Sequence, residues 1–326
     1  MYEPTHGNPT DAINVSWRDY VSTRVASTER HLVGGIPDYA FALDMSLRQK
    51  LHAMPGFDRI AKTMMSTIIP QQKQQLAMNG LKVGPTQMPE VYAMVVDCAR
   101  RLGIGTPEVY IEHDIQMNAY SVAMSDDAPL IAITTGMLER ATPGELKAVI
   151  GHECGHSHNN HSLYNNMAVI LIEMAAGAIP GMGALMNLVS TPFQLALNAW
   201  SRAAEVTADR AGVICSDDIN DSITLQAKLL SGGAIGVGND FDVDAIVRQY
   251  DAFQGTSARY FELNSTHPVG ARRILAVREF MHSETLYTWR PEWRSPNMKL
   301  IDKAELDARC DKVVSVHKSE KRGDAR

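Results

Sequence analysis

The residues His152-Glu153-Cys154-Gly155-His156 form an H-E-x-x-H motif, which constrains this chain more than any other stretch. Two histidines four residues apart lie on the same side of an α-helix, so both imidazoles can bind one tetrahedral zinc ion. Glu153 directly follows the first histidine, where its carboxylate can act as a general base on a water molecule. The motif therefore predicts a hydrolytic metal site; a surface helix that carries two histidines by chance is the alternative.

The residues before the motif predict that it lies in a helix. Thr142 is suited to the N-cap, and Pro143 and Glu145 occupy positions favoured at a helix start. Apolar residues follow at Leu146, Val149 and Ile150.

A catalytic zinc site needs a third protein ligand, and two known arrangements could supply it. In one, the motif continues as H-E-x-x-H-x-x-G-x-x-H. Here Asn159 stands at the glycine position and Ser162 at the last position, while His161 is one residue out of register. This arrangement is excluded.

In the other arrangement a glutamate comes from a second helix. Within Ser201–Asp209, Glu205 and Asp209 lie four residues apart and share a helix face. Glu205 can bind the metal, and Asp209 can accept a hydrogen bond from the far nitrogen of His152. An ordinary solvated helix face is the alternative for this pair.

Four stretches occur in a fixed order along the chain. They are Asn118–Tyr120, Ile131–Leu138, Glu145–His161, and Ser201–Asp209 followed by Ser265–Pro268. Together they resemble the N-A-[FY], small-Gly-[LM]-[LM], E-L-x-x-V-x-x-H-E-x-G-H-x-x-x-x-H and S-R-x-x-E-x-x-A-D … S-x-H-P patterns of peptidase family M48. Cys154 departs from the family pattern, which usually has leucine or another apolar residue there.

The resemblance implies a soluble zinc metalloendopeptidase of the zincin-like (gluzincin) type. It implies one Zn²⁺ per chain, with His152, His156 and Glu205 as metal ligands and Glu153 as the general base. The implied substrate is a peptide or an unfolded protein. His161 and His158 are expected to face solvent or to lie behind the ligands.

Two further assignments depend on the resemblance and have alternatives. Asn118, Ala119 and Tyr120 are expected to form an edge strand that pairs with an extended substrate, with a plain core strand as the alternative. His267 could hydrogen-bond the oxyanion formed at the scissile carbonyl, or it could cap the helix that begins at Thr266–Pro268.

The expected fold class is α+β and predominantly helical, with a small sheet above the motif helix. Helices are expected at residues 43–54, 57–69, 88–102, 221–230 and 243–250, and strands at 80–83, 107–112, 118–124 and 130–134. We expect an N-terminal extension (residues 1–40), a metallopeptidase domain (41–290) and a C-terminal extension (291–326). Residues 313–326 are charged and are expected to form a disordered tail.

Charge and cysteine content limit the function classes and the compartment. The net charge of −6 gives no electrostatic support for nucleic-acid binding. The four cysteines show no paired spacing, which favours a reducing compartment, with simply unpaired thiols as the alternative. Residues 1–30 contain no signal-peptide pattern, so a cytoplasmic protein, with a peripheral membrane location as the alternative, is expected.

The segment from Met174 to Ser201 contains no charged residue. Its length would admit a membrane-spanning helix, but Pro180, Pro192 and three glycines interrupt it. A helical hairpin that covers the cleft is favoured over membrane contact.

Two other functions are compatible with the same residues. One is a non-catalytic interaction protein stabilised by zinc, in which Cys154 or His161 would close the metal site. The geometry of a helix argues against Cys154, because it lies two residues from each histidine and points elsewhere. The other is a zinc hydrolase that acts on something other than peptides.

Overall fold

The fold is described from a computed structural model. The described residues are 31–54, 57, 66, 69–122, 130–161, 164, 167, 191–233, 241–252 and 269–314. The chain divides into two units, residues 1–38 and residues 39–326. In the first unit, β1 (Leu32–Val33) pairs antiparallel with β2 (Ile36–Pro37). Gly34 and Gly35 form the turn at positive φ, which glycine adopts without strain.

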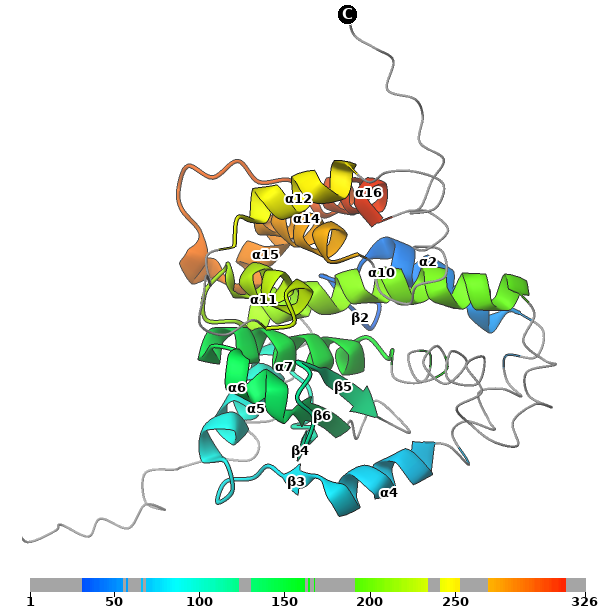
Figure 1. Cartoon of the computed structure of the whole chain (residues 1–326). Coiled ribbons are helices and arrows are strands. Elements are labelled where there is room, and N and C mark those ends of the chain that lie inside the picture. The colour runs from blue at the N-terminus through cyan, green and yellow to red at the C-terminus, as the bar shows by residue number, and fades with distance from the viewer. Residues whose placement is uncertain are drawn as a thin grey trace, which may run out of the picture. The chain divides into compact units, whose positions relative to one another are not determined.

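Helices α7 (Pro143–His158) and α10 (Thr191–Cys215) pack against each other in the second unit, and α7 lies between α10 and the sheet (Figure 1). Glycines at the contact bring the two backbones close together. A Cβ on Gly212 of α10 would lie 2.8 Å from the carbonyl oxygen of Ala148 of α7. Larger side chains at such positions would push the helices apart.

The sheet has four strands in the order β3-β4-β6-β5. They are β3 (Leu81–Lys82), β4 (Glu108–Glu112), β6 (Leu130–Thr134) and β5 (Ala119–Val122). β4 and β6 run parallel, and the other two neighbouring pairs are antiparallel. β5 ends the order, so it is an edge strand of the described sheet.

The two faces of the sheet pack against different helices, as the alternation of side chains along a strand requires. Ile131 and Ile133 of β6 join the main core, which also contains residues of α5, α7 and α10. Leu130 and Ala132 point the other way and pack with residues of α4 (Ile69–Asn79).

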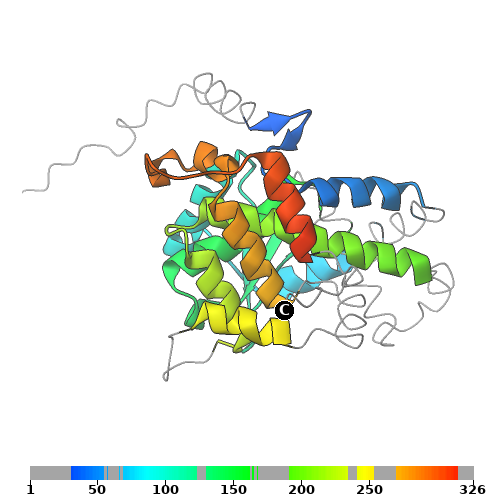
Figure 2. The ribbon, with the colours of Figure 1, turned by 90° about the horizontal axis from the view of Figure 1, so that it is seen from above.

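Further helices surround the α7–α10 pair. They are α2 (Ala42–His52), α5 (Pro89–Leu102), α6 (Thr135–Arg140), α11 (Asp221–Leu230), α12 (Val243–Ala252), α14 (Gly270–Met281), α15 (Glu284–Trp289), the 3-10 helix η2 (Pro291–Trp293) and α16 (Lys303–Val314). Helix α2 packs on α10, and α5 and α11 pack on α7. Helix α14 contacts α10 and α11, and α16 lies beside α14 (Figure 2).

The expected fold class is confirmed, since helices predominate around one small sheet. The helices expected at residues 43–54, 88–102, 221–230 and 243–250 are present with small shifts at their ends, and so are the four strands. Most of the helix expected at 57–69 lies outside the described residues. The tail expected from residue 313 was placed too early, because Val313 and Val314 belong to α16, where Val314 is buried.

The apolar segment at 174–201 is only partly described. Residues 191–201 form the first turns of α10, and the rest, where the hairpin was expected, lies outside the described residues. Within the part of the chain that the structure describes, we find no helix with the length and apolar character needed to span a membrane.

Candidate metal centre

Local sequence signals explain why the H-E-x-x-H residues lie in a helix. Thr142 is the N-cap of α7, and its hydroxyl accepts a hydrogen bond from the Glu145 backbone N–H at 3.2 Å. The Glu145 carboxylate accepts one from the Thr142 N–H at 2.7 Å, which completes a capping box. Pro143 occupies the first turn. The helix start expected from the sequence is confirmed.

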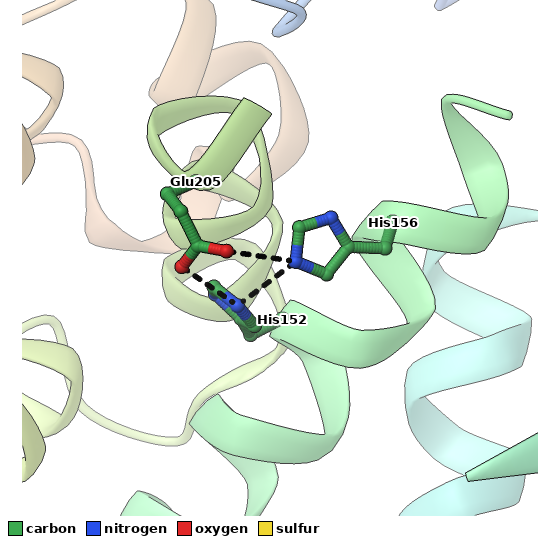
Figure 3. A group of neighbouring side chains, drawn as sticks. All are labelled: His152, His156 and Glu205. Atoms are coloured by element: carbon green, nitrogen blue, oxygen red, sulfur yellow. Dashed lines mark hydrogen bonds and ion pairs between the residues drawn. The ribbon is translucent and has the colours of Figure 1, made fainter. Parts of the chain in front are cut away.

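Three side chains from α7 and α10 converge on one point (Figure 3). The Nε2 atoms of His152 and His156 lie 3.2 Å apart. Each also lies 3.5 Å from one carboxylate oxygen of Glu205. All three residues are buried, with at most 9% of their surface exposed.

These separations fit a tetrahedral zinc ion. Ligand atoms at about 2.0–2.1 Å from zinc stand about 3.3–3.4 Å apart when they occupy tetrahedral corners. The three observed separations of 3.2, 3.5 and 3.5 Å bracket that value. Two imidazole nitrogens and one carboxylate are also the donor set of open, catalytic zinc sites.

The fourth corner is free of protein ligands in the described part of the chain. Among described histidine, cysteine, aspartate and glutamate residues, the cluster contains His152, His156 and Glu205 and no fourth member. Cys154 is fully buried in the main hydrophobic core instead. His161 lies behind His156 and contacts its Nδ1 atom, on the side away from Glu205. An arrangement closed by either residue therefore does not occur.

Asp209 lies behind His152, as the sequence predicted. Its carboxylate is 3.0 Å from His152 Nδ1, which leaves Nε2 of that ring facing the cluster. Burial alone would raise the pKa of Asp209, but the charge and hydrogen bonds of Arg273, together with the contact to His152, outweigh burial and lower the pKa. Asp209 is therefore an ionised acceptor that can hold the His152 ring.

Arg273 of α14 is a site residue that the sequence analysis missed. Its Nε atom donates to Asp209 at 2.8 Å, and its Nη1 atom lies 3.1 Å from Glu205. Burial alone would lower the pKa of this guanidinium. The charges of Asp209 and Glu205 act in the opposite direction, and the pKa is raised above its ordinary value. A single arginine on an amphipathic helix gives no sequence signal of such a role.

The Glu153 carboxylate lies beside the cluster. The side chain is buried, with 5% exposed. Its negative charge helps to raise the pKa of His156, where Glu205 provides the larger effect and together they outweigh burial. The same charge also contributes to the raised pKa of Arg273. Glu153 therefore lies near enough to the cluster for its charge to act on His156 and Arg273.

The remaining predicted site residues are less closely tied to the cluster. Ala119 and Tyr120 lie on edge strand β5, and Asn118 directly precedes it. The Tyr120 side chain packs on the α4 face of the sheet and donates to Glu112 at 2.6 Å. His267 lies outside the described residues.

A His₂Glu cluster carried by an H-E-x-x-H helix and a second helix, with a small sheet alongside, defines the zincin-like class of metal-dependent hydrolases. Comparisons with known proteins agree. The model of peptidase family M48 matches residues 85–281. Plastoglobule-localized metallopeptidase 48, chloroplastic, of Arabidopsis thaliana is 26% identical over 255 residues, which cover 76% of this chain and 73% of that protein.

A solved structure was also matched. The crystal structure of S. mikatae Ste24p aligns with a TM-score of 0.39 and 16% identity, covering 80% of this chain and 67% of that one. The match to the family model spans more than half of the 326 residues, and the chain belongs to peptidase family M48. It is a metallopeptidase, an enzyme that hydrolyses peptide bonds.

Proposed function

We propose that this chain is a zinc-dependent endopeptidase that cleaves peptides or unfolded proteins. One zinc ion per chain would be held by His152, His156 and Glu205. The observation that carries the proposal is the spacing of three ligand atoms at 3.2 and 3.5 Å, which matches three corners of a tetrahedral zinc site.

Glu153 acts as the general base in the proposed reaction. When bound, zinc would polarise the scissile carbonyl and lower the pKa of the attacking water. The Glu153 carboxylate takes a proton from that water as the water oxygen adds to the carbonyl carbon. It then delivers this proton to the leaving amine nitrogen as the C–N bond breaks. Asp209 keeps the His152 ring in place throughout, through the bond to Nδ1.

Residues 118–120 hold the substrate in this proposal. An extended peptide pairs through backbone hydrogen bonds with the edge of β5 that has no neighbouring strand among the described residues. The contribution of Tyr120 comes from its backbone, since its side chain is bonded to Glu112 on the other face of the sheet. His267 donates a hydrogen bond to the oxyanion.

The proposed catalytic domain covers residues 41–290, flanked by extensions at residues 1–40 and 291–326. We propose no nucleic-acid partner, in keeping with the net charge of −6. Contact of residues 174–201 with a membrane is not favoured.

The test combines metal analysis with digestion. Purified protein is assayed for zinc by elemental analysis and for cleavage of casein and of a peptide library, with and without a chelator. We expect about one zinc per chain, internal cleavage of peptides, loss of cleavage with the chelator and recovery with added zinc. A chain that binds zinc but cleaves no peptide under these conditions would contradict the proposal.

A further inference from the structure

Helix α2 contributes a buried carboxylate next to the metal centre. Asp44 has no exposed surface, and its carboxylate accepts three hydrogen bonds. His161 Nε2 and Trp200 Nε1 each donate at 2.8 Å, and the Thr207 hydroxyl donates at 2.9 Å. Burying a carboxylate requires a large desolvation free energy unless hydrogen bonds compensate for it, and an apolar residue could fill the space without this penalty. This side chain therefore calls for a functional explanation.

His161 connects Asp44 to the ligand histidine His156. The Nδ1 atoms of the two rings lie 3.0 Å apart. Such a pair forms a hydrogen bond only when one nitrogen carries a hydrogen and the other does not. The Nε2 atom of His161 faces an acceptor, the Asp44 carboxylate, and so it carries the hydrogen of the neutral ring.

The direction of the remaining bonds follows from that assignment. The Nδ1 atom of His161 has a free lone pair and accepts, so His156 Nδ1–H is the donor. The Nε2 atom of His156 then has its lone pair directed at the cluster, 3.2 Å from His152 Nε2 and 3.5 Å from Glu205. This is the tautomer that a metal ion requires.

The two ligand histidines are thus oriented by two different carboxylates. His152 bonds to Asp209 directly, and Asp209 lies four residues beyond the ligand Glu205 on the same helix. His156 is held by Asp44 through His161. Asp44 lies outside residues 85–281, the part of the chain that matches the family model.

Neighbouring residues of the same segment hold this arrangement in place. The Phe41 backbone N–H donates to the Thr207 hydroxyl at 3.1 Å. Arg48 donates to the carbonyl oxygen of Asn159, beyond the end of α7. Asn159 Nδ2 in turn donates to the Tyr39 hydroxyl at 3.0 Å. Hydrogen bonds from residues 39–48 therefore hold in place the end of α7 and the loop that leads to His161.

We propose that Asp44 is a positioning residue that fixes the orientation and tautomer of His156 through His161, so that helix α2 completes the metal centre. The inference rests on the proposed function only in that the centre binds zinc. Its main readout is therefore zinc affinity, and it does not depend on peptide cleavage.

The test compares Asp44→Asn with the matched change Asp97→Asn. Asp97 likewise accepts hydrogen bonds from other side chains, here Arg101 and Lys147, but it lies on α5 away from the metal centre. The dissociation constant for zinc is measured by competition with a chelator, and the fold is checked by circular dichroism. Asp44→Asn should weaken zinc binding about 10- to 100-fold, while Asp97→Asn should leave it unchanged. Equal affinity of the folded Asp44→Asn variant and the parent would overturn the proposal.

A double variant tests the path through His161. If Asp44 acts through that ring, Asp44→Asn should weaken zinc binding little further in a chain that already carries His161→Gln. Full additivity of the two losses would overturn the path.

A measurement on the unaltered zinc-loaded protein covers the case in which the variants fail to fold. Long-range ¹H–¹⁵N correlation spectra report which ring nitrogen carries the hydrogen. We expect His161 with hydrogen on Nε2 and His156 with hydrogen on Nδ1. A hydrogen on Nδ1 of His161 would overturn the proposal. Absence of peptide cleavage by this protein would instead contradict the proposed function and leave these results standing.

Discussion

Gly155 of α7 faces Ala211 of α10 so closely that a Cβ atom on Gly155 would lie 2.5 Å from the Cβ of Ala211 and 3.2 Å from the Cα of Ala208. Gly155 lies between the ligands His152 and His156 in the sequence, and Ala208 lies three residues after Glu205. The close contact of the two helices therefore sets the distance between the two histidines and the carboxylate.

The first prediction concerns this contact. Gly155→Ala should destabilise the protein by about 1–3 kcal/mol, because the added methyl group has no space between the helices. It should also weaken zinc binding, because the added methyl group would displace α10 and move Glu205 away from the two histidines. Thermal unfolding and chelator competition measure the two effects. Gly105→Ala is the control, since a Cβ there meets nothing within 4 Å. Equal effects of both variants would refute the packing argument.

The second prediction concerns Glu205 as a ligand. Glu205→Ala should leave the purified protein with far less than one zinc per chain, because a site of two histidines holds the ion weakly. Elemental analysis after gel filtration gives the zinc content. Glu90→Ala, an exposed glutamate on α5, should retain full zinc. Full zinc occupancy in the Glu205→Ala variant would remove Glu205 from the coordination shell.

The third prediction separates catalysis from metal binding. Glu153→Gln should retain zinc but lose at least about 100-fold in the rate of peptide cleavage, since a carboxamide cannot accept the proton from water. Initial rates on one peptide substrate, together with the zinc content, provide the measurement. Glu90→Gln makes the same chemical change away from the site. If the Glu153→Gln enzyme cleaved as fast as the parent, Glu153 would not be the base.

The sequence predicted those parts of the site whose signals are local. Thr142 and Glu145 belong to one stretch of four residues, and their capping box marks the start of α7. The i, i+4 spacing of Glu205 and Asp209 places both on one helix face. Asp44 and Arg273 could not be found in this way. Each reaches the centre from a separate helix, more than 60 residues from its partner in the sequence.

A different kind of miss concerns α16. Charged residues dominate its sequence, but the buried residues Leu306, Cys310 and Val314 recur every four positions. This is a helical period, and the signal was therefore available. Because the tail was expected from residue 313, only Val313 and Val314, the last residues of this helix, contradict the expectation.

The fourth prediction concerns Arg273. Arg273→Leu should lower the free energy of unfolding of the metal-free protein by about 3 kcal/mol, because it removes a buried cation that pairs with Asp209 and Glu205. Denaturant unfolding measures the change. Arg248→Leu is the control, because Arg248 and its partner Asp242 are more than 60% exposed, and it should cost less than about 0.5 kcal/mol. Similar costs for both variants would show that the buried network contributes little.

The fifth prediction concerns stability in acid. Partial burial would raise the pKa of Asp97, but hydrogen bonds from Arg100, Arg101 and Lys147 outweigh it and lower the pKa from 3.8 to about 2. The unfolded chain therefore binds a proton at Asp97 more readily than the folded one. The resulting stabilisation is fully present above pH 3.8 and is lost as the pH falls through about 2.

The stabilisation by Asp97 is modest, because its carboxylate is only partly shielded from solvent. We expect Asp97 to contribute about 1 kcal/mol at neutral pH after allowance for screening. Urea unfolding of the parent and of Asp97→Asn at pH values between 2 and 7 measures the difference. The gap between the two free energies of unfolding should be largest near pH 7 and should close towards pH 2, because the protonated carboxyl then resembles the amide. A gap that stayed constant across this range would show that Asp97 stabilises the fold by packing and not through its charge.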